Sequence, residues 1–292
     1  MKAYAIAAAH RYNYVTGEGE AVMGYQIMVE PGVQVYVEDL NPQGAHTILF
    51  LHGWPLNGSA YEYQLEHLPK MGFRCLAMDT RGFGRSDRPW HGYDYNRLAD
   101  DVRAVIDTFG LEGITLAGHS MGGAIAIRYM ARHGGKGVGK LALFGAAAPS
   151  FVRRPDFPYG KMRDEVNALI EQGYKSRPTM LRAFGDMFFY RYVPPALIDW
   201  FLGLGLEAAG WATMQCLVTL RDSTMFGDLG RIRVPTLILH GVHDKICPFA
   251  LGEMQHKGIR TSVLVPFEES GHGLFWEQRE KFNSELAGFA GS

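Results

Sequence analysis

The sequence predicts an α/β protein, with a mostly parallel central sheet, helices on both faces and an inserted helical segment. Three observations predict this class. Short apolar runs alternate with segments of helical period, which is typical of parallel sheets. Most of these runs are continuously apolar, as expected for strands that are buried on both faces. The alternation stops between residues 150 and 230, where only helical segments occur, and then resumes.

The predicted elements follow one another along the chain. An antiparallel hairpin is expected from Tyr25, where two alternating runs are split by Pro31-Gly32. The further predicted strands cover residues 46–53, 73–79, 113–119, 140–149, 233–241 and 261–266. The predicted core helices cover 59–71, 96–110, 121–134, 249–258 and 275–290. Helical segments rich in Phe, Met, Leu and Trp cover 163–174, 179–190, 194–206 and 208–222.

These elements divide the chain into a core and an insertion. We expect residues 23–149 and 231–292 to form the core, and residues 150–230 to form a helical cap. Residues 1–22 contain a short Ala-rich stretch that only weakly resembles a signal peptide, so export is not expected. Because a second methionine, Met23, stands just before the alternating pattern, we expect residues 1–22 to be an extension outside the core.

Composition limits the class of partner. The chain has 292 residues, of which 47% are hydrophobic and 20% charged, as in ordinary globular proteins. The net charge is −1 and no basic run occurs, so neither nucleic acid nor a membrane surface is an expected partner. Cys75, Cys216 and Cys247 are far apart and form no CxxC pair, which predicts neither a disulfide framework nor a zinc site. This cysteine usage favours a reducing, cytoplasmic location.

The segment Gly118-His119-Ser120-Met121-Gly122 carries the clearest chemical signal. It is a G-x-S-x-G motif between a predicted strand and a predicted helix, the context in which such a serine is a nucleophile. The small neighbours let strand and helix approach, and the helix N-terminus favours developing negative charge. A glycine-rich turn with a capping serine is the alternative, but the strand–turn–helix context favours the nucleophile. The side chain of His119 is expected to pack away from the site.

A serine nucleophile needs a base and an acid, which follow it in the order acid, then histidine, in this arrangement. Asp244 comes directly after the strand of residues 233–241, and His272 stands between glycines after the last strand. Glu268 and Glu269 are rival acids, but Asp244 is preferred because it follows a strand end. His240 and His243 lie nearer to Asp244 in sequence and are interpreted as structural or solvent-exposed histidines.

An oxyanion hole requires amide donors near the serine. The strand of residues 46–53 runs into Trp54-Pro55, and the amide of Trp54 is the expected donor because proline has no N–H. The amide of Met121 is the second expected donor. The alternative is a simple turn after a buried strand, but two independent motifs at matching strand ends favour the functional interpretation.

With these residues in place, a family resemblance is apparent. The segments LFLHGWPLN, MDTRGFGRSDRPW, ITLAGHSMGG, LILHGVHD and SGHG together resemble the α/β-hydrolase superfamily. More narrowly, they resemble the cofactor-free haloperoxidase and esterase family, known as non-heme chloroperoxidases. The resemblance runs from Met23 to the C-terminus. It implies the α/β-hydrolase fold and a Ser120–His272–Asp244 triad, with Trp54 and Met121 as the oxyanion hole and no metal or cofactor.

The resemblance also implies an activity. Members hydrolyse small carboxylic esters through an acyl-enzyme, and many form peracids from short carboxylic acids and hydrogen peroxide. Pro55 fits the pattern associated with that perhydrolysis, whereas many haloperoxidase-like members have Phe at the position of His119.

Relatives that use aspartate as the nucleophile differ, because Ser120 occupies that position here. Two alternatives stay open, a small-lactam or amide hydrolase with the same triad, and a hydrolase-fold receptor for a small molecule. The oligomeric state is not predicted.

Aromatic residues of the insertion are candidates for the substrate pocket. We expect a pocket for a modest acyl or aryl group over Ser120, since ligand pockets are mostly apolar. Most of these aromatic side chains are also expected to pack the cap onto the core. The named pocket candidates are Phe184, Phe188, Trp200 and Trp211.

Overall fold

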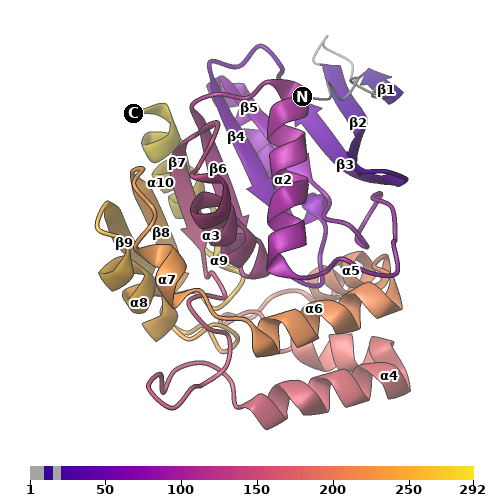
Figure 1. The fold of residues 1–292 in the computed structure, drawn as a ribbon, viewed down its shortest axis with the longest axis vertical. Helices are drawn as coiled ribbons and strands as arrows, with labels where there is room; N and C mark the ends of the chain where they lie inside the picture. Colours follow the sequence, from indigo (N-terminus) through magenta and orange to yellow (C-terminus); the bar gives the residue numbers. More distant parts are fainter. Residues whose placement is uncertain (1–9, 16–20) are drawn as a thin grey trace.

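Nine strands form one continuous sheet in the computed structural model, which describes residues 10–15 and 21–292 (Figure 1). Their order across the sheet is β1-β2-β3-β5-β4-β6-β7-β8-β9. The strands are β1 (His10–Val15), β2 (Ala21–Glu30), β3 (Val33–Leu40), β4 (His46–Leu51), β5 (Phe73–Met78), β6 (Ile114–His119), β7 (Val138–Phe144), β8 (Thr236–Gly241) and β9 (Ser262–Phe267).

The sheet is antiparallel at one edge and parallel elsewhere. Strands β1, β2, β3 and β5 pair antiparallel, and all pairs from β5 through β4 to β9 are parallel. The parallel part is thus built from strands joined by crossover helices. Its register places Leu51 opposite Gly118, and His119 opposite Phe144. The carboxyl ends of β4, β6 and β7 therefore meet at one edge, where ligand sites of such sheets are found.

Helices cover both faces of this sheet. Helices α2 and α3 pack against each other on one face, whereas α10 lies on the other (Figure 1). The core helices are α1 (Glu62–His67), α2 (Tyr95–Phe109), α3 (Met121–His133), α7 (Phe226–Leu229), α8 (Ala250–Gly258), α9 (Leu274–Glu277) and α10 (Arg279–Gly291), with short 3-10 turns at Gly58–Tyr61 and Pro69–Met71. The helix predicted over 275–290 is interrupted at Gln278, which separates α9 from α10.

The insertion between β7 and β8 is helical, as predicted. It contains α4 (Arg163–Gly185), α5 (Pro195–Leu206) and α6 (Gly210–Asp222), which lie together at the bottom of Figure 1. Helix α4 is bent at Ser176, where the backbone is extended (φ −159°, ψ 88°), and Pro178 follows. This bend falls between the two helices predicted there. The second of them was expected to reach residue 190 but ends at Gly185, so residues 186–194 form a loop.

The N-terminal segment contributes to the sheet edge. Strand β1 (His10–Val15) pairs antiparallel with β2, with His10 opposite Gln26. Part of the segment 1–22 that was expected outside the core is therefore an edge strand. Residues 1–9 and 16–20 lie outside the described residues.

The core is centred on the parallel strands. Leu49 in β4, Leu116 in β6, Leu141 in β7 and Leu239 in β8 are fully buried. Burial on both faces explains why these strands are apolar without alternation. Burying a leucine side chain contributes roughly 1.5–3 kcal/mol. These buried strands hold the carboxyl edge of the sheet in place.

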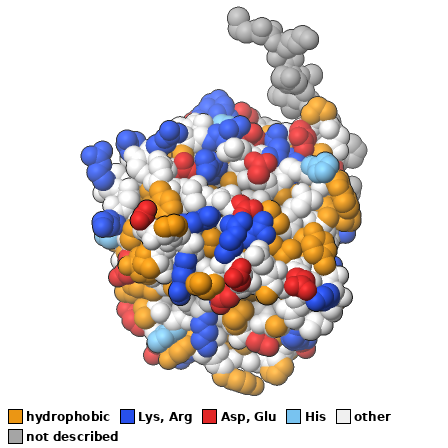
Figure 2. Space-filling view, turned by 60° about the horizontal axis from the view of Figure 1, so that its bottom comes forward, with side chains coloured by type: hydrophobic (Ala, Val, Ile, Leu, Met, Phe, Trp, Pro, Cys, Tyr) orange, Lys and Arg blue, Asp and Glu red, His pale blue; other side chains and the backbone are white. Residues whose placement is uncertain are grey.

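The surface shows no large field of one charge on the face drawn in Figure 2. Basic, acidic and apolar side chains are interspersed there, with the end of the molecule that carries the cap brought forward (Figure 2). Among the described residues, no single helix is long and apolar enough to cross a membrane. Only α5 and α6 taken together reach that length and hydropathy, and they are bent by 96° at their junction.

Candidate active site

Ser120 lies at the sharp turn between β6 and α3, in a backbone conformation that is rare for a side-chain-bearing residue. Its φ of 53° and ψ of −117° fall in the left-handed half of the map. Such conformations cost on the order of 1–3 kcal/mol and persist only when the surroundings enforce them. The enforcing contacts are main-chain bonds, from Ser120 N–H to the Phe144 carbonyl (2.9 Å) and from Ala124 and Ala147 N–H to the Ser120 carbonyl.

The small residues of the motif are required by close packing. A Cβ on Gly118 would lie 2.5 Å from the carbonyl oxygen of Gly122, and a Cβ on Gly122 would lie 2.3 Å from that of Leu51. A Cβ on Gly53 would lie 3.0 Å from the Ser120 Cβ. The elbow therefore touches both its own helix and the loop after β4, and only glycine fits at these positions.

Asp244 and His272, the acid and the base that the sequence predicts, lie next to each other in the structure. His272 Nδ1 lies 2.6 Å from Asp244 Oδ2, and both side chains are buried. The other carboxylate oxygen, Oδ1, accepts hydrogen bonds from the amides of Ile246 and Cys247, each at 2.8 Å. The carboxylate is thus oriented from both sides, and because it can only accept hydrogen bonds, His272 Nδ1 is the donor of this pair.

The second ring nitrogen of His272, Nε2, is not hydrogen-bonded to Asp244. It is buried and has no hydrogen-bond partner among the described residues. A buried, unpaired ring nitrogen is uncommon in folded proteins. This nitrogen is therefore available to a hydroxyl group or a ligand.

The two glutamates considered as alternatives to Asp244 lie away from His272. Glu268 pairs with Lys281 (2.9 Å) and Glu269 pairs with Arg191 (3.2 Å), both at the surface. Burial, followed by the neighbouring Asp244 carboxylate, raises the pKa of the Cys247 thiol well above its usual value. Because only the thiolate is a strong nucleophile, Cys247 is no competitor for Ser120 at neutral pH.

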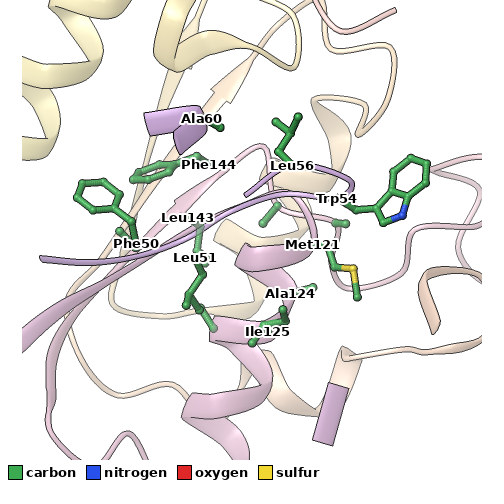
Figure 3. Packing of buried hydrophobic residues seen from close by; sticks show 14 of the residues in the cluster. Phe50, Leu51, Trp54, Leu56, Ala60, Met121, Ala124, Ile125, Leu143 and Phe144 are labelled. Carbon is green, nitrogen blue, oxygen red and sulfur yellow. The ribbon is translucent and has the colours of Figure 1, made fainter. Parts of the chain in front are cut away.

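Two free amides lie beside Ser120. Neither Trp54 N–H nor Met121 N–H donates a hydrogen bond to another described residue. Trp54 is on the chain that leaves β4 and Met121 is in the first turn of α3, and the two residues are neighbours in Figure 3. The first amides of a helix lack intrahelical partners and favour negative charge. This arrangement can stabilise the oxyanion of a tetrahedral intermediate.

A residue that the sequence reasoning missed, His52, orients one of these amides. Its Nε2 accepts a hydrogen bond from Thr80 N–H (3.0 Å), so Nδ1 must carry the proton, and Nδ1 lies 3.0 Å from the Gly53 carbonyl oxygen. This carbonyl and the Trp54 N–H belong to one planar trans peptide and point in opposite directions. The Leu56 N–H donates to the same carbonyl oxygen (2.9 Å), so His52 and Leu56 together hold this peptide and aim its amide. Burial lowers the pKa of His52 to about 4, which keeps the imidazole neutral.

Comparison with known proteins shows the family of the chain. The profile of the alpha/beta hydrolase family matches residues 48–285. The chain belongs to the alpha/beta hydrolase family. It is 51% identical to the AB hydrolase superfamily protein YisY of Bacillus subtilis, over 92% of this chain and all of that protein. It is 31% identical to a bifunctional esterase/perhydrolase of Acinetobacter calcoaceticus, over 91% of this chain and 99% of that protein.

Solved structures agree with this family membership. An esterase from Exiguobacterium antarcticum superposes with a TM-score of 0.89 at 44% identity, over 91% of this chain and 99% of that chain. A bromoperoxidase from Bacillus anthracis superposes with a TM-score of 0.88 at 28% identity, over 92% of this chain and all of that chain. The fold predicted from the sequence is therefore confirmed.

His119 of this α/β hydrolase does not pack away from the site, contrary to the expectation. Its Nε2 lies 3.0 Å from the carbonyl oxygen of His272, and the two rings are 4.4 Å apart between centroids. Burial, followed by the neighbouring His272, lowers the pKa of His119 well below its usual value, so it is a neutral donor. The expectation was wrong because the partner comes from a loop 153 residues later, which no local pattern reveals.

His240 and His243 have the structural and exposed roles expected of them. His240 is fully buried, and its Nε2 lies 2.7 Å from the Cys247 carbonyl oxygen. The exposed His243 stacks on Tyr190, with 3.6 Å between ring centroids. His240 thereby supports the loop that carries Asp244.

A narrow apolar cavity of about 20 Å³ lies beneath the cap of the hydrolase. It borders the site, because its lining includes Pro55 and Leu56 from the oxyanion loop together with Phe188, whose ring packs edge-on against His272 at 5.2 Å. Phe184 also lines it and contacts the Trp54 ring at 4.9 Å. A cavity of this volume has room for little more than one small group.

The other two pocket candidates lie away from this cavity. Trp200 packs against Tyr63 and Phe201. Trp211 donates its indole N–H to the Pro89 carbonyl (2.9 Å) and packs on Trp90. Both tryptophans attach the cap to the core, which is the role expected for most aromatic residues of the insertion.

Proposed function

We propose that this protein is a serine hydrolase that cleaves small carboxylic esters through an acyl-enzyme. The observation that carries the proposal is the unpaired, buried Nε2 of His272, held by Asp244 beside a conformationally strained Ser120. A 44% identical structural relative bears the name esterase, which supports the same class of substrate.

The mechanism follows from these positions. His272 Nε2 takes the hydroxyl proton as Ser120 Oγ attacks the ester carbonyl, and Asp244 stabilises the resulting imidazolium. The amides of Trp54 and Met121 receive the oxyanion. His272 then protonates the departing alkoxide, which leaves the acyl group on Ser120. A water molecule, deprotonated by the same nitrogen, attacks this acyl group and releases the carboxylic acid.

The cavity suggests which esters fit. Its apolar lining and small volume favour a short acyl chain. Longer acyl chains would require the cap side chains to move. We further propose that the protein works in a reducing compartment such as the cytoplasm, which its three buried, unpaired thiols support.

A direct test is hydrolysis of p-nitrophenyl acetate by the wild type, Ser120→Ala and Ser284→Ala. Ser284 is an exposed serine on α10, away from the triad, and serves as the control. Loss of the nucleophile is expected to lower kcat by about 10⁶, the scale for serine hydrolases. Equal rates in the wild type and Ser120→Ala would contradict the proposal and favour the small-molecule receptor.

Perhydrolysis is the second candidate, favoured by the relative named as a bifunctional esterase/perhydrolase. In this reaction hydrogen peroxide replaces water in the deacylation step, so the product is a peracid. The test is peracid formation from acetate and hydrogen peroxide, with Ser120→Ala as the control. Comparison of an ester with its matched amide, run in parallel, tests the lactam or amide hydrolase alternative.

A further inference from the structure

Glu277 is a partly buried carboxylate at the end of α9 that the proposed mechanism does not use. Its Oε1 accepts hydrogen bonds from the amides of Tyr190 (2.7 Å) and Arg191 (2.8 Å). Its Oε2 accepts one from the amide of Gly271 (2.7 Å). A single carboxylate thus binds main-chain amides from two segments that lie about 80 residues apart in sequence.

The two segments are the loop of the cap, residues 188–191, and the base loop, residues 270–273, which carries His272. They touch directly, because Gly273 N–H donates to the Phe188 carbonyl at 3.0 Å. A Cβ on Gly271 would lie 2.8 Å from Tyr190 N, so only glycine allows this approach. The cap loop therefore packs directly against the base loop.

The contact reaches the catalytic ring itself. Phe188 belongs to the cap loop, and its ring packs edge-on against His272, with 5.2 Å between centroids and 83° between planes. Displacement of the cap loop would remove this packing surface. Glu277 is placed to prevent that displacement, because it binds both loops at once.

A carboxylate is the group that this geometry requires. The three amides need three acceptor lone pairs, two from one oxygen and one from the other. No Lys, Arg or His of the described residues forms an ion pair with Glu277, so its hydrogen-bond donors are main-chain amides. A glutamine has only one acceptor oxygen, and its NH₂ group would oppose an amide N–H.

We propose that Glu277 is a positioning residue that holds His272 in place by tying the base loop to the cap loop. The proposal rests on the serine-hydrolase function proposed above, since it concerns the base of that reaction. It adds a role for the cap beyond forming the pocket, because the cap then supports the catalytic base.

The test compares Glu277→Gln with Glu280→Gln for hydrolysis of p-nitrophenyl acetate. Glu280 is exposed, and its one ion pair within residues 10–15 and 21–292 is with Arg279. Its variant loses the same charge, so it is the matched control and should keep the wild-type rate. Displacement of a catalytic group by about 1 Å costs about 100-fold in rate. We therefore expect Glu277→Gln to lower kcat about 10- to 100-fold with little change in KM, at a temperature where circular dichroism shows a folded protein.

A double-mutant cycle with His272→Ala separates positioning from a general structural role. If Glu277 acts through His272, Glu277→Gln should change the residual rate of His272→Ala less than about twofold. An unchanged kcat in Glu277→Gln, or an equal loss in both backgrounds, would overturn the proposal. If Glu277→Gln does not fold, the same cycle with Glu277→Asp decides, because aspartate is one methylene too short to bind both loops. Failure of the serine-hydrolase function itself would show separately, as an unaffected Ser120→Ala.

Discussion

The imidazole of His119 lies against that of His272, and its Nε2 is 3.0 Å from the carbonyl oxygen of the same residue. The variable position of the nucleophile motif thus contacts the main chain of the catalytic base. Phe275 and Phe188 pack around the His119 ring, so the contact is enclosed. Ser120 and His272 are consequently connected through the side chain of His119, which directly precedes Ser120 in the motif.

His119→Phe tests this connection. Phenylalanine keeps the ring packing but leaves the buried carbonyl of His272 without its donor, which costs roughly 1–3 kcal/mol of unfolding free energy. We expect a lower kcat for p-nitrophenyl acetate and a lower urea midpoint. His119→Gln, which places an amide nitrogen near the position of Nε2, should recover part of both. Equal behaviour of the two variants would show that the hydrogen bond is dispensable.

His52→Leu tests the orientation of the oxyanion amide. Leucine removes one of the two donors to the Gly53 carbonyl and leaves only the Leu56 N–H, so the Trp54 N–H is held less firmly. Because loss of a whole oxyanion donor costs about 10²- to 10³-fold in kcat, misorientation should cost about 10- to 100-fold. His52→Asn keeps a donor near Nδ1 and should be less impaired. An unaltered kcat in a folded His52→Leu protein would contradict this role.

The free energy of unfolding should decrease as the pH is lowered from about 6.5 to about 4, because of His52. Burial lowers its pKa to about 4, and its bond to Gly53 opposes this only in part. In the unfolded chain the same group titrates near its ordinary pKa of 6.5. Below that pH the unfolded state binds a proton that the folded state does not, so the stabilisation is complete above pH 6.5 and is lost toward pH 4.

The size of this effect is on the order of 3 kcal/mol for His52 alone. His119 and His240, whose pKa values are lowered mainly by burial, act in the same direction. Urea unfolding at pH 8, 6.5, 5.5 and 4.5 measures it. An unfolding free energy that stays constant from pH 8 to pH 4.5 would exclude buried neutral histidines.

Gly185→Ala tests whether the cavity holds the acyl group. Gly185 lines the cavity, and an added Cβ would meet only Ile198 Cγ2 at 3.9 Å, so the methyl group enters free space. A methylene in an apolar pocket is worth about 10- to 200-fold in selectivity. We expect the ratio of kcat/KM for p-nitrophenyl butyrate to that for the acetate to fall about 10-fold.

Gly203→Ala is the control for that substitution. Gly203 also lies in a cap helix, but nothing is within 4 Å of an added Cβ, and it does not line the cavity. Its ester selectivity should equal that of the wild type. The same ratio in both variants would place the acyl group elsewhere.

The fold, and the placement of the three proposed triad residues after strand ends, were predictable because their signals are local. Apolar runs reveal buried strands, and Ser120, Asp244 and His272 each follow the end of such a run. The supporting residues were not predictable, since each acts through the main chain of a distant loop. His119 contacts the loop of His272, and Glu277 contacts the cap loop. Neither contact leaves a pattern in the sequence.

The cap was predicted least accurately, again for a physical reason. Its helices are apolar on more than one side, so composition does not tell which aromatic ring faces the cavity and which attaches cap to core. Phe188 and Trp211 look equivalent in sequence. The structure places Phe188 against His272, and Trp211 against Pro89 and Trp90.

The most direct test of the central claim is covalent labelling with a fluorophosphonate, followed by peptide mapping by mass spectrometry. If Ser120 is a nucleophile activated by His272, the wild type should carry one label on Ser120. The label should be absent from Ser120→Ala and form much more slowly in His272→Ala. A label on another residue, or equal labelling of Ser120→Ala, would contradict the account.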